Sequence, residues 1–434
     1  MLFLACTLLF TLLLSIFARA RARKTTEALR GRLRVLFPPL RAPNAPAFLD
    51  NAAGSLVPSR VIDAVASVLM TRGAVNSLPG YPWGRENAAL AASAHDATAL
   101  FVNAPGGGGD RALGPSATAL TFRVSAALSR RLQPGDAVVV SELEHECNAS
   151  PWRELARGGV ELRVWRAAWP AGALELPALH ALLADGRVRL VALTAASNAF
   201  GLKTPVKAAA SAAHAAGALI FVDAVHAAAH ELPDVARDDL DFLVFSPYKC
   251  CAPHLGALYV RGSLVAGLDV PRLCFKPADT LSKVEYGTPQ FEALAGWLAA
   301  VEYYCKDVAG CAGVSRAALE LAFKSIEALE APLKEALVKG LCETPGVTVY
   351  GAVAPEARVG TVAFRVRGAS PKDAALRLGE RGVCVGNGDF YALLPSEAQR
   401  LLPDGVLRAS VAHYNTLAEV ERLLEGVRAL AKAA

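Results

Sequence analysis

An aspartate and a lysine stand at the ends of two consecutive apolar segments of this 434-residue chain. Asp223 ends the core of ALIFVDAVH (218–226), and Lys249 follows LDFLVFSP (240–247), 26 positions further on. That separation fits one strand–helix–strand step, so both side chains are expected at the same edge of a parallel sheet. An apolar setting strips hydration from a lysine, which lowers its pKa and frees the amine to act as a nucleophile.

This pairing is what an aldehyde cofactor requires. The amine of Lys249 supplies a Schiff-base partner, and the carboxylate of Asp223 supplies an anion against the nitrogen of the cofactor ring. A lysine at the end of a strand is more often a plain surface charge, so the interpretation depends on the two residues together.

The surrounding segments predict an α/β domain. Short, continuously apolar runs are interrupted by helical ones, which indicates a mostly parallel sheet covered on both faces. Strands are expected at 136–140, 188–198, 218–226 and 240–247, with an alanine-rich helix at 205–217. Ligands of such sheets bind beyond the carboxyl ends of the strands. The polar residues expected there are Glu144, His145, Asn148, Ser197, Asn198, Asp223, His226, Ser246 and Lys249.

The pattern changes near residue 300. A long helical stretch at 315–341 is followed by the strand-like GTVAFRVRG and VLRASVAHYNT and then by a helix from Leu417. These segments predict a smaller α+β domain at 301–434, packed against a large domain at 41–300.

The first eighteen residues are uncharged and apolar, close to the minimum length of a membrane-spanning helix. Basic residues follow this run, which favours an N-terminal hydrophobic helix that anchors a cytosolic body in the membrane. A cleaved secretory signal and an organelle-targeting leader are the alternatives. Residues 1–40 are therefore set apart from the fold as a leader or anchor with a basic flank.

The net charge of +5 does not point to nucleic acid. Residues 19–40 carry seven bases and one acid, a balance of +6, so the remaining chain is close to −1. The bases of this flank are suited to anionic lipid headgroups instead. Nine cysteines without Cys-x-x-Cys pairs or zinc-type spacing indicate buried thiols in a reducing compartment, and no metal site is expected.

A series of motifs, in order, resembles the class V aminotransferases, which are fold-type I enzymes dependent on pyridoxal phosphate. The resemblance covers nearly everything from about residue 46 to 430 and is greatest to the cysteine desulfurase-like branch, which is related to selenocysteine lyases and isopenicillin N epimerases. The motifs are FLDNAAGSLVP (48–58), GPSATALTF (114–122), SELEHECNASPW (141–152), ASNAFGLKTPV (196–206), FVDAVHAAAH (221–230), FSPYKCCAPHLGALY (245–259), YGTPQF (286–291) and LRASVAHYNTLAEVERLL (407–424).

The resemblance implies a cofactor contact for each matching position. Lys249 would form the Schiff base, and Asp223 would pair with the protonated ring nitrogen. His145 would stack on the ring face, His226 would contact the hydroxyl side of the ring, and Asn198 would lie near the ring oxygen.

The resemblance also implies how the phosphate and the substrate are held. Arg408 would bind the substrate carboxylate through two hydrogen bonds. Backbone N–H groups at a helix start and two hydroxyls would hold the phosphate. The residues concerned are Ser116, Ala117, Thr118, Ser246 and Thr288, the last acting across a homodimer in the neighbouring site.

Two departures from the family pattern matter. Tyr248 precedes the lysine where desulfurases commonly have histidine, and the stretch GDFYA (388–392) places Tyr391 where they carry a nucleophilic cysteine. A phenol cannot accept sulfur as a persulfide. Cys384, seven residues upstream of Tyr391, is the alternative nucleophile if it swings into the site. Cys250 and Cys251 are expected to pack behind the cofactor lysine and not to act as nucleophiles.

The leading hypothesis is an enzyme that binds a small amino acid and removes its α-proton, with Lys249 as the acid and base. The family suggests a cysteine desulfurase-like enzyme, whereas the missing loop cysteine favours a lyase, an isopenicillin N epimerase-like enzyme or an aminotransferase. A catalytically silent, membrane-tethered scaffold is the alternative of another class. Retention of Lys249, Asp223, His145 and Arg408 argues against it.

Overall fold

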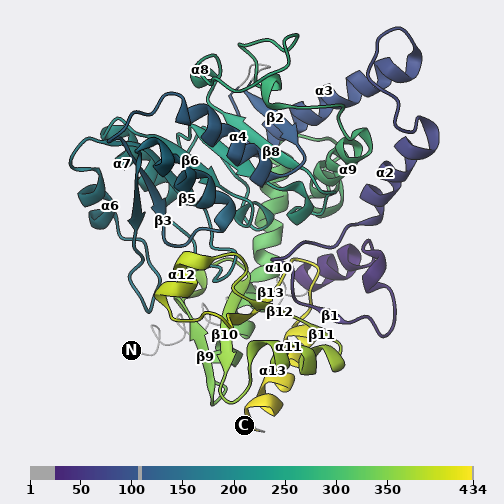
Figure 1. Ribbon diagram of the computed structural model, residues 1–434. Helices are drawn as coiled ribbons and strands as arrows, with labels where there is room; N and C mark the ends of the chain where they lie inside the picture. The colour runs from purple at the N-terminus through teal and green to yellow at the C-terminus, as the bar shows by residue number, and fades with distance from the viewer. Residues whose placement is uncertain (1–24, 106–109, 433–434) are drawn as a thin grey trace, which may run out of the picture.

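The larger part of the molecule is built on a seven-stranded sheet, seen in the upper half of Figure 1. The computed structural model describes residues 25–105 and 110–432. The strand order is β2-β8-β7-β6-β5-β3-β4, and only β8 runs against the others, so the predicted mostly parallel sheet is confirmed. The strands are β2 (Arg111–Gly114), β3 (Ala137–Ser141), β4 (Glu161–Trp165), β5 (Val188–Thr194), β6 (Leu219–Asp223), β7 (Phe242–Phe245) and β8 (Gly256–Val260).

Both faces of this sheet are buried. Along β6, Ile220 and Val222 belong to one hydrophobic core, and Phe221 between them belongs to another, as expected where successive side chains point to opposite faces. The first core includes helices α2 (Ser59–Thr71), α3 (Pro82–Val102), α7 (Val206–Ala215) and α9 (Phe291–Glu302). The second includes α4 (Ala117–Ser129) and α5 (Ser150–Arg153). Two short helices, α6 (Leu176–Leu183) and α8 (Gly262–Val265), complete this part.

The smaller part carries a four-stranded antiparallel sheet of order β12-β13-β10-β9, which confirms the α+β prediction. Its strands are β9 (Val347–Tyr350), β10 (Thr361–Val366), β12 (Gly386–Gly388) and β13 (Val406–Ser410). A parallel pair joins β1 (Ala47–Phe48) to β11 (Val383–Cys384). The helices are α10 (Arg316–Cys342), α11 (Pro371–Glu380), α12 (Leu393–Ala398) and α13 (Leu417–Lys432), and α10 links the two parts (Figure 1).

Residues 25–40 belong to the folded body, which corrects their assignment to a separate leader. Arg30 is only 2% exposed, and its guanidinium donates to the backbone oxygen of Leu329 at 2.8 Å. Arg34 pairs with Glu419 of α13 at 2.9 Å, and Phe37 lies in the core. These two bases therefore serve the fold rather than a lipid surface. The domain boundary near residue 300 remains a prediction.

The predicted hydrophobic helix and membrane anchor at 1–18 lies outside the described residues. Across 25–105 and 110–432, the helices are all too short or too polar to cross a bilayer.

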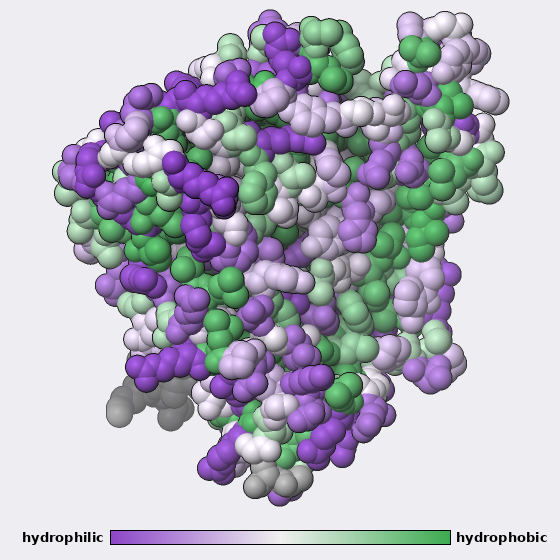
Figure 2. Space-filling view, viewed as in Figure 1, coloured by the Kyte–Doolittle hydropathy of each residue, from purple (hydrophilic) through white to green (hydrophobic). Residues whose placement is uncertain are grey.

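Hydrophobic side chains gather on the outer surface of α2, at the right of the space-filling view in Figure 2. Leu69 is 52% exposed and Met70 is 79% exposed. Leu78 and Trp83, between α2 and α3 and at the start of α3, are also more than half exposed. An apolar patch of this kind is typical of a protein–protein contact.

Candidate active site

A cavity of about 140 Å³ lies at the carboxyl ends of β5, β6 and β7. It is where the sheet topology predicts a ligand site. The predicted site residues that line it are Ser116, Ala117, Thr118, His145, Asn198, Asp223, His226, Ser246 and Lys249. Arg408 and Thr288 do not line it. Cys147, Thr194, Ala196 and Val225 line it without having been predicted.

Asp223 is fixed by one donor on each carboxylate oxygen. The Val225 N–H donates to Oδ1 at 2.8 Å, and the Cys147 thiol donates to Oδ2 across 3.2 Å. Burial and then the charge of Asp223 raise the pKa of Cys147, so this thiol stays protonated. Cys147 lies within the motif at 141–152, but nothing in the sequence showed that its thiol would point at Asp223.

Lys249 is 7% exposed and ends the short turn Pro247–Lys249 that follows β7. Burial, together with repulsion from Arg408, lowers its pKa to about 8, although the carboxylate of Asp223 opposes this shift. About a tenth of the amine is therefore neutral at pH 7, far more than for an ordinary lysine, and the neutral form is the one that attacks an aldehyde.

The loop after β3 presents His145 to the cavity. Its Nδ1 accepts a hydrogen bond from the Cys147 N–H at 2.9 Å, which leaves the proton of the neutral ring on Nε2. Burial lowers the pKa of His145, so the ring is uncharged. Glu144 ties this loop to β5 by accepting from the Thr194 N–H at 2.6 Å. Burial raises the pKa of Glu144 to about 8.

The start of α4 forms an anion-binding corner of the cavity. Ser116 caps the helix by accepting from the Ala119 N–H at 3.1 Å, while Ala117 and Thr118 line the cavity. A Cβ on Gly256 of β8 would lie 2.2 Å from the carbonyl carbon of Ser116. Only glycine therefore lets this strand approach the corner, where free helix N–H groups are suited to a phosphate.

Two buried polar atoms that belong to cavity-lining residues have no partner within the described part of the chain. They are Oδ1 of Asn198 and Nδ1 of His226. Buried polar groups are normally hydrogen-bonded, so these atoms indicate a polar ligand. Together with Lys249, Asp223 and the α4 corner, they fit an aldehyde on an aromatic ring that carries a phosphate and an oxygen substituent.

Arg408 lies behind Asn198 and is 3% exposed. One terminal nitrogen donates to the Asn198 backbone oxygen at 3.1 Å, and the other pairs with Asp50 at 2.9 Å. The ring of Phe390 covers the guanidinium at 3.8 Å, and Nε has no hydrogen-bond partner among the residues that the structure describes. Burial lowers the pKa of Arg408. The pairing with Asp50 was not predicted, although Asp50 lies in the quoted motif at 48–58.

The loop at 388–392 places its tyrosine beside a cavity-lining residue, because the rings of Tyr391 and His145 lie 5.6 Å apart. The backbone oxygen of Phe390 accepts from the side-chain amide of Asn198 at 2.9 Å, and that of Tyr391 accepts from the Glu146 N–H at 2.8 Å. The loop is thus tied to the cavity by its backbone, whereas the Tyr391 side chain is 71% exposed.

The three cysteines that the sequence analysis considered do not line the cavity. Cys250 and Cys251 are buried in the core beside α9 and α10, which agrees with their predicted packing role. Cys384 is partly exposed on β11.

Thr288 lines a separate surface pocket with Gly114, Pro115 and Tyr286, and is exposed. Its own chain therefore does not bring it to the cavity. In the described part of the chain, no group of three or more His, Cys, Asp or Glu side chains is arranged to hold a metal ion.

Comparison with known proteins identifies the family. Residues 47–423 match the family model described as aminotransferase class-V. The chain is 30% identical over 402 residues to a cysteine desulfurase of Serratia proteamaculans, covering 89% of this chain and 93% of the relative. It is 31% identical over 396 residues to a cysteine desulfurase of an Enterobacter species, covering 88% of this chain and 92% of the relative.

Solved structures agree with these sequence matches. The apo cysteine desulfurase of Thermococcus onnurineus superposes with a TM-score of 0.82 at 25% identity, covering 93% of this chain and 98% of that one. A cysteine desulfurase of Escherichia coli gives a TM-score of 0.77 at 24% identity with the same coverage, which supports the fold. The chain therefore belongs to the class V aminotransferase family, in its cysteine desulfurase-like branch, and is a pyridoxal-phosphate enzyme.

Proposed function

We propose that this enzyme cleaves the carbon–sulfur bond of L-cysteine or of a closely related β-substituted amino acid, without passing the sulfur to a cysteine of its own. The observation that carries this proposal is the cavity that combines Lys249 and Asp223, with the buried Arg408 bonded to the backbone of a residue that lines it. The loop position that would hold a nucleophilic thiol carries Tyr391 instead. Its relatives named cysteine desulfurases favour the substrate class.

Five side chains would hold the cofactor ring. Pyridoxal phosphate, when bound, supplies an electron sink for the substrate α-carbon. Lys249 would hold it covalently and, once released by the substrate amine, would move the proton at that carbon. Asp223 would bind the ring nitrogen, His145 would cover one ring face, and Asn198 and His226 would face the ring oxygen.

The phosphate and the substrate would be bound at opposite ends of the site. The backbone N–H groups of Ala117 and Thr118 and the hydroxyls of Ser116 and Ser246 would hold the phosphate. Arg408 would hold the substrate carboxylate. Because Asp50 already engages this arginine, the substrate would share or displace that contact.

Two balanced reactions would release the sulfur of cysteine at such a site. Cysteine and water give pyruvate, ammonia and hydrogen sulfide, whereas cysteine and a thiol give alanine and a persulfide. Cys147 is a poor acceptor, because its thiol is buried and directed at Asp223, on the side of the ring nitrogen. Sulfur would therefore leave as free sulfide or pass to a diffusible thiol.

Product analysis tests this route. With L-cysteine, we expect sulfide to form in an amount equal to pyruvate, persulfide to form in an amount equal to alanine, and alanine to increase when a small thiol is added. The Cys384→Ser variant should keep the wild-type rate to within about twofold, because a partly exposed side chain on β11 that makes no catalytic contact changes little. Loss of activity in Cys384→Ser, with a persulfide on Cys384 in the wild type, would contradict the proposal. Racemised cysteine or a keto acid that keeps its sulfur would instead identify an epimerase or an aminotransferase.

Cofactor uptake should depend on the charge of Lys249. Only the neutral amine attacks the aldehyde, and the pKa of Lys249 is lowered to about 8. The rate at which the cofactor-free protein gains its visible absorption band should therefore rise as the pH increases and level off above about 8. A rate that keeps rising towards the ordinary lysine pKa would show that the amine is not desolvated.

We further infer that the enzyme is a homodimer. The exposed apolar side chains of Leu69, Met70, Leu78 and Trp83 favour a protein partner. Thr288 lies in a surface pocket of its own chain, as suits a residue that acts in a neighbouring site. Sedimentation velocity would measure the oligomeric state.

We propose that residues 1–18 attach the enzyme to a membrane, with the folded body in the cytosol, or direct it to an organelle. The uncharged, apolar composition of this segment supports the proposal. Fractionation of cells expressing the full chain, beside a form that begins at residue 25, would test it.

A further inference from the structure

The two nitrogens of the His226 imidazole differ in their surroundings. Its Nε2 lies 3.0 Å from the Thr361 hydroxyl, whereas Nδ1 is buried and unpartnered among the described residues. Burial, followed by the charge of Lys249, lowers the pKa of His226, so the ring is neutral and carries a single proton. Which nitrogen holds that proton determines what His226 can offer to a ligand in the cavity.

The Thr361 hydroxyl can donate to Nε2 or accept from it, and the donating arrangement is the one that equips the cavity with a donor. When it donates to Nε2, the proton of the ring must be on Nδ1, which then becomes a donor on a residue that lines the cavity. A donor at this position suits the oxygen substituent of the cofactor ring, which is a strong acceptor when it carries negative charge.

Thr361 is rigidly placed. It is completely buried at the start of β10 and pairs with Ser410 of β13. The large domain packs tightly against its backbone, since a Cβ on Gly201 would lie 2.1 Å from the Thr361 oxygen, and Gly201 itself has a φ of +73°. The hydroxyl therefore has little freedom to move away from His226.

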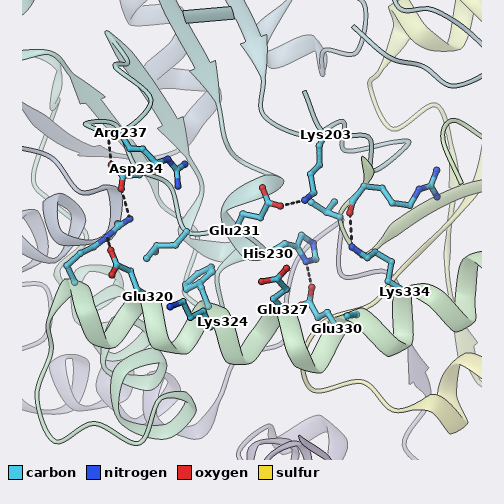
Figure 3. A pocket seen from close by; sticks show the side chains of 17 residues that line it. Lys203, His230, Glu231, Asp234, Arg237, Glu320, Lys324, Glu327, Glu330 and Lys334 are labelled. Carbon is cyan, nitrogen blue, oxygen red and sulfur yellow. Dashed lines mark hydrogen bonds and ion pairs between the residues drawn. The ribbon is translucent and has the colours of Figure 1, made fainter. Parts of the chain in front are cut away.

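The turn that begins at His226 is also held at its other end. His230 follows the short helical turn Ala227–Ala229, and its Nδ1 lies 2.7 Å from the Glu330 carboxylate on α10 (Figure 3). The rings of His226 and His230 meet edge to face at 5.4 Å. Glu330 and His230 line a cleft of about 430 Å³. Side chains from the C-terminal part of the chain thus hold both ends of a turn that belongs to the large sheet.

We propose that Thr361 is a positioning residue for the cofactor, because its hydroxyl fixes the tautomer and the orientation in which His226 meets the cofactor ring oxygen. This inference rests on the proposed function, which places that oxygen beside His226. It gives the small domain a direct part in building the cofactor site.

Cofactor titration of three proteins tests this role. Cofactor-free wild type, Thr361→Val and Thr361→Ser are titrated with pyridoxal phosphate, and each resulting visible band is then followed against pH. Valine has the shape of threonine without the hydroxyl, so we expect the affinity to fall roughly five- to tenfold. The pH midpoint of its band should also shift, because the hydrogen bond to the ring oxygen is less well fixed. Thr361→Ser keeps the hydroxyl and should bind to within about twofold of the wild type.

Far-UV circular dichroism and thermal unfolding establish that each variant is folded, and Thr361→Ala is the second hydroxyl-free variant if valine does not fold. The inference is overturned if the hydroxyl-free variant binds and titrates like the wild type, or if Thr361→Ser is impaired as much as Thr361→Val. If the wild type itself gains no band, the proposed function fails and this inference fails with it.

Discussion

Lys249→Ala should lower the turnover of L-cysteine by roughly a thousandfold or more, because one side chain supplies both the covalent anchor and the proton transfer. The variant should still fold. An amine that is buried deeply enough to lower its pKa to about 8 is costly to bury, so its removal should not reduce the free energy of unfolding. Steady-state kinetics beside thermal unfolding measures both effects.

Lys207→Ala is the matched control. Lys207 lies on α7, a helix that packs on the same sheet, and its side chain is exposed. Its replacement should therefore leave turnover and stability unchanged. A Lys249→Ala enzyme that turns over at a tenth of the wild-type rate or faster would show that Lys249 is not a catalytic residue.

Arg408→Gln should lower kcat/KM for L-cysteine by about a hundredfold or more, because a buried charge pair with the substrate carboxylate is lost. The effect should depend on that carboxylate. Cysteamine, which lacks it, should react equally slowly with the variant and the wild type, so the preference of the enzyme for cysteine over cysteamine should disappear.

Arg365→Gln provides the control for the small-domain sheet. Arg365 lies on β10, the strand paired with that of Arg408, and it donates to the backbone oxygens of Gly405 and Leu401. Its loss should lower the melting temperature without changing the preference between the two substrates. If Arg408→Gln also lowers only the melting temperature, the substrate carboxylate is bound elsewhere.

The sheet and its ligand edge were predictable because they follow from local sequence patterns. A short apolar run that ends in a polar residue marks both a buried parallel strand and the edge where ligands bind. Asp223 and Lys249 were therefore placed correctly at one cavity from their spacing alone. The long helix expected at 315–341 is α10, Arg316–Cys342.

The contacts that refine the site were not predictable, because they join residues far apart in the chain. Asp50 and Arg408 are 358 positions apart, and His226 and Thr361 are 135 apart. No local pattern indicates such a pair. The role of Arg30 was misread for the same reason, since its basic neighbourhood resembles a membrane flank until its contact with Leu329 is seen.

Every role proposed for the site depends on the bond between Lys249 and the cofactor. The most direct measurement is to reduce the loaded enzyme with borohydride, digest it, and locate the added mass by peptide sequencing in a mass spectrometer. We expect the pyridoxyl group on Lys249, in the peptide that contains Ser246 and Cys250. A label on another lysine, or no label on a protein that has been saturated with pyridoxal phosphate, would contradict this account of the site.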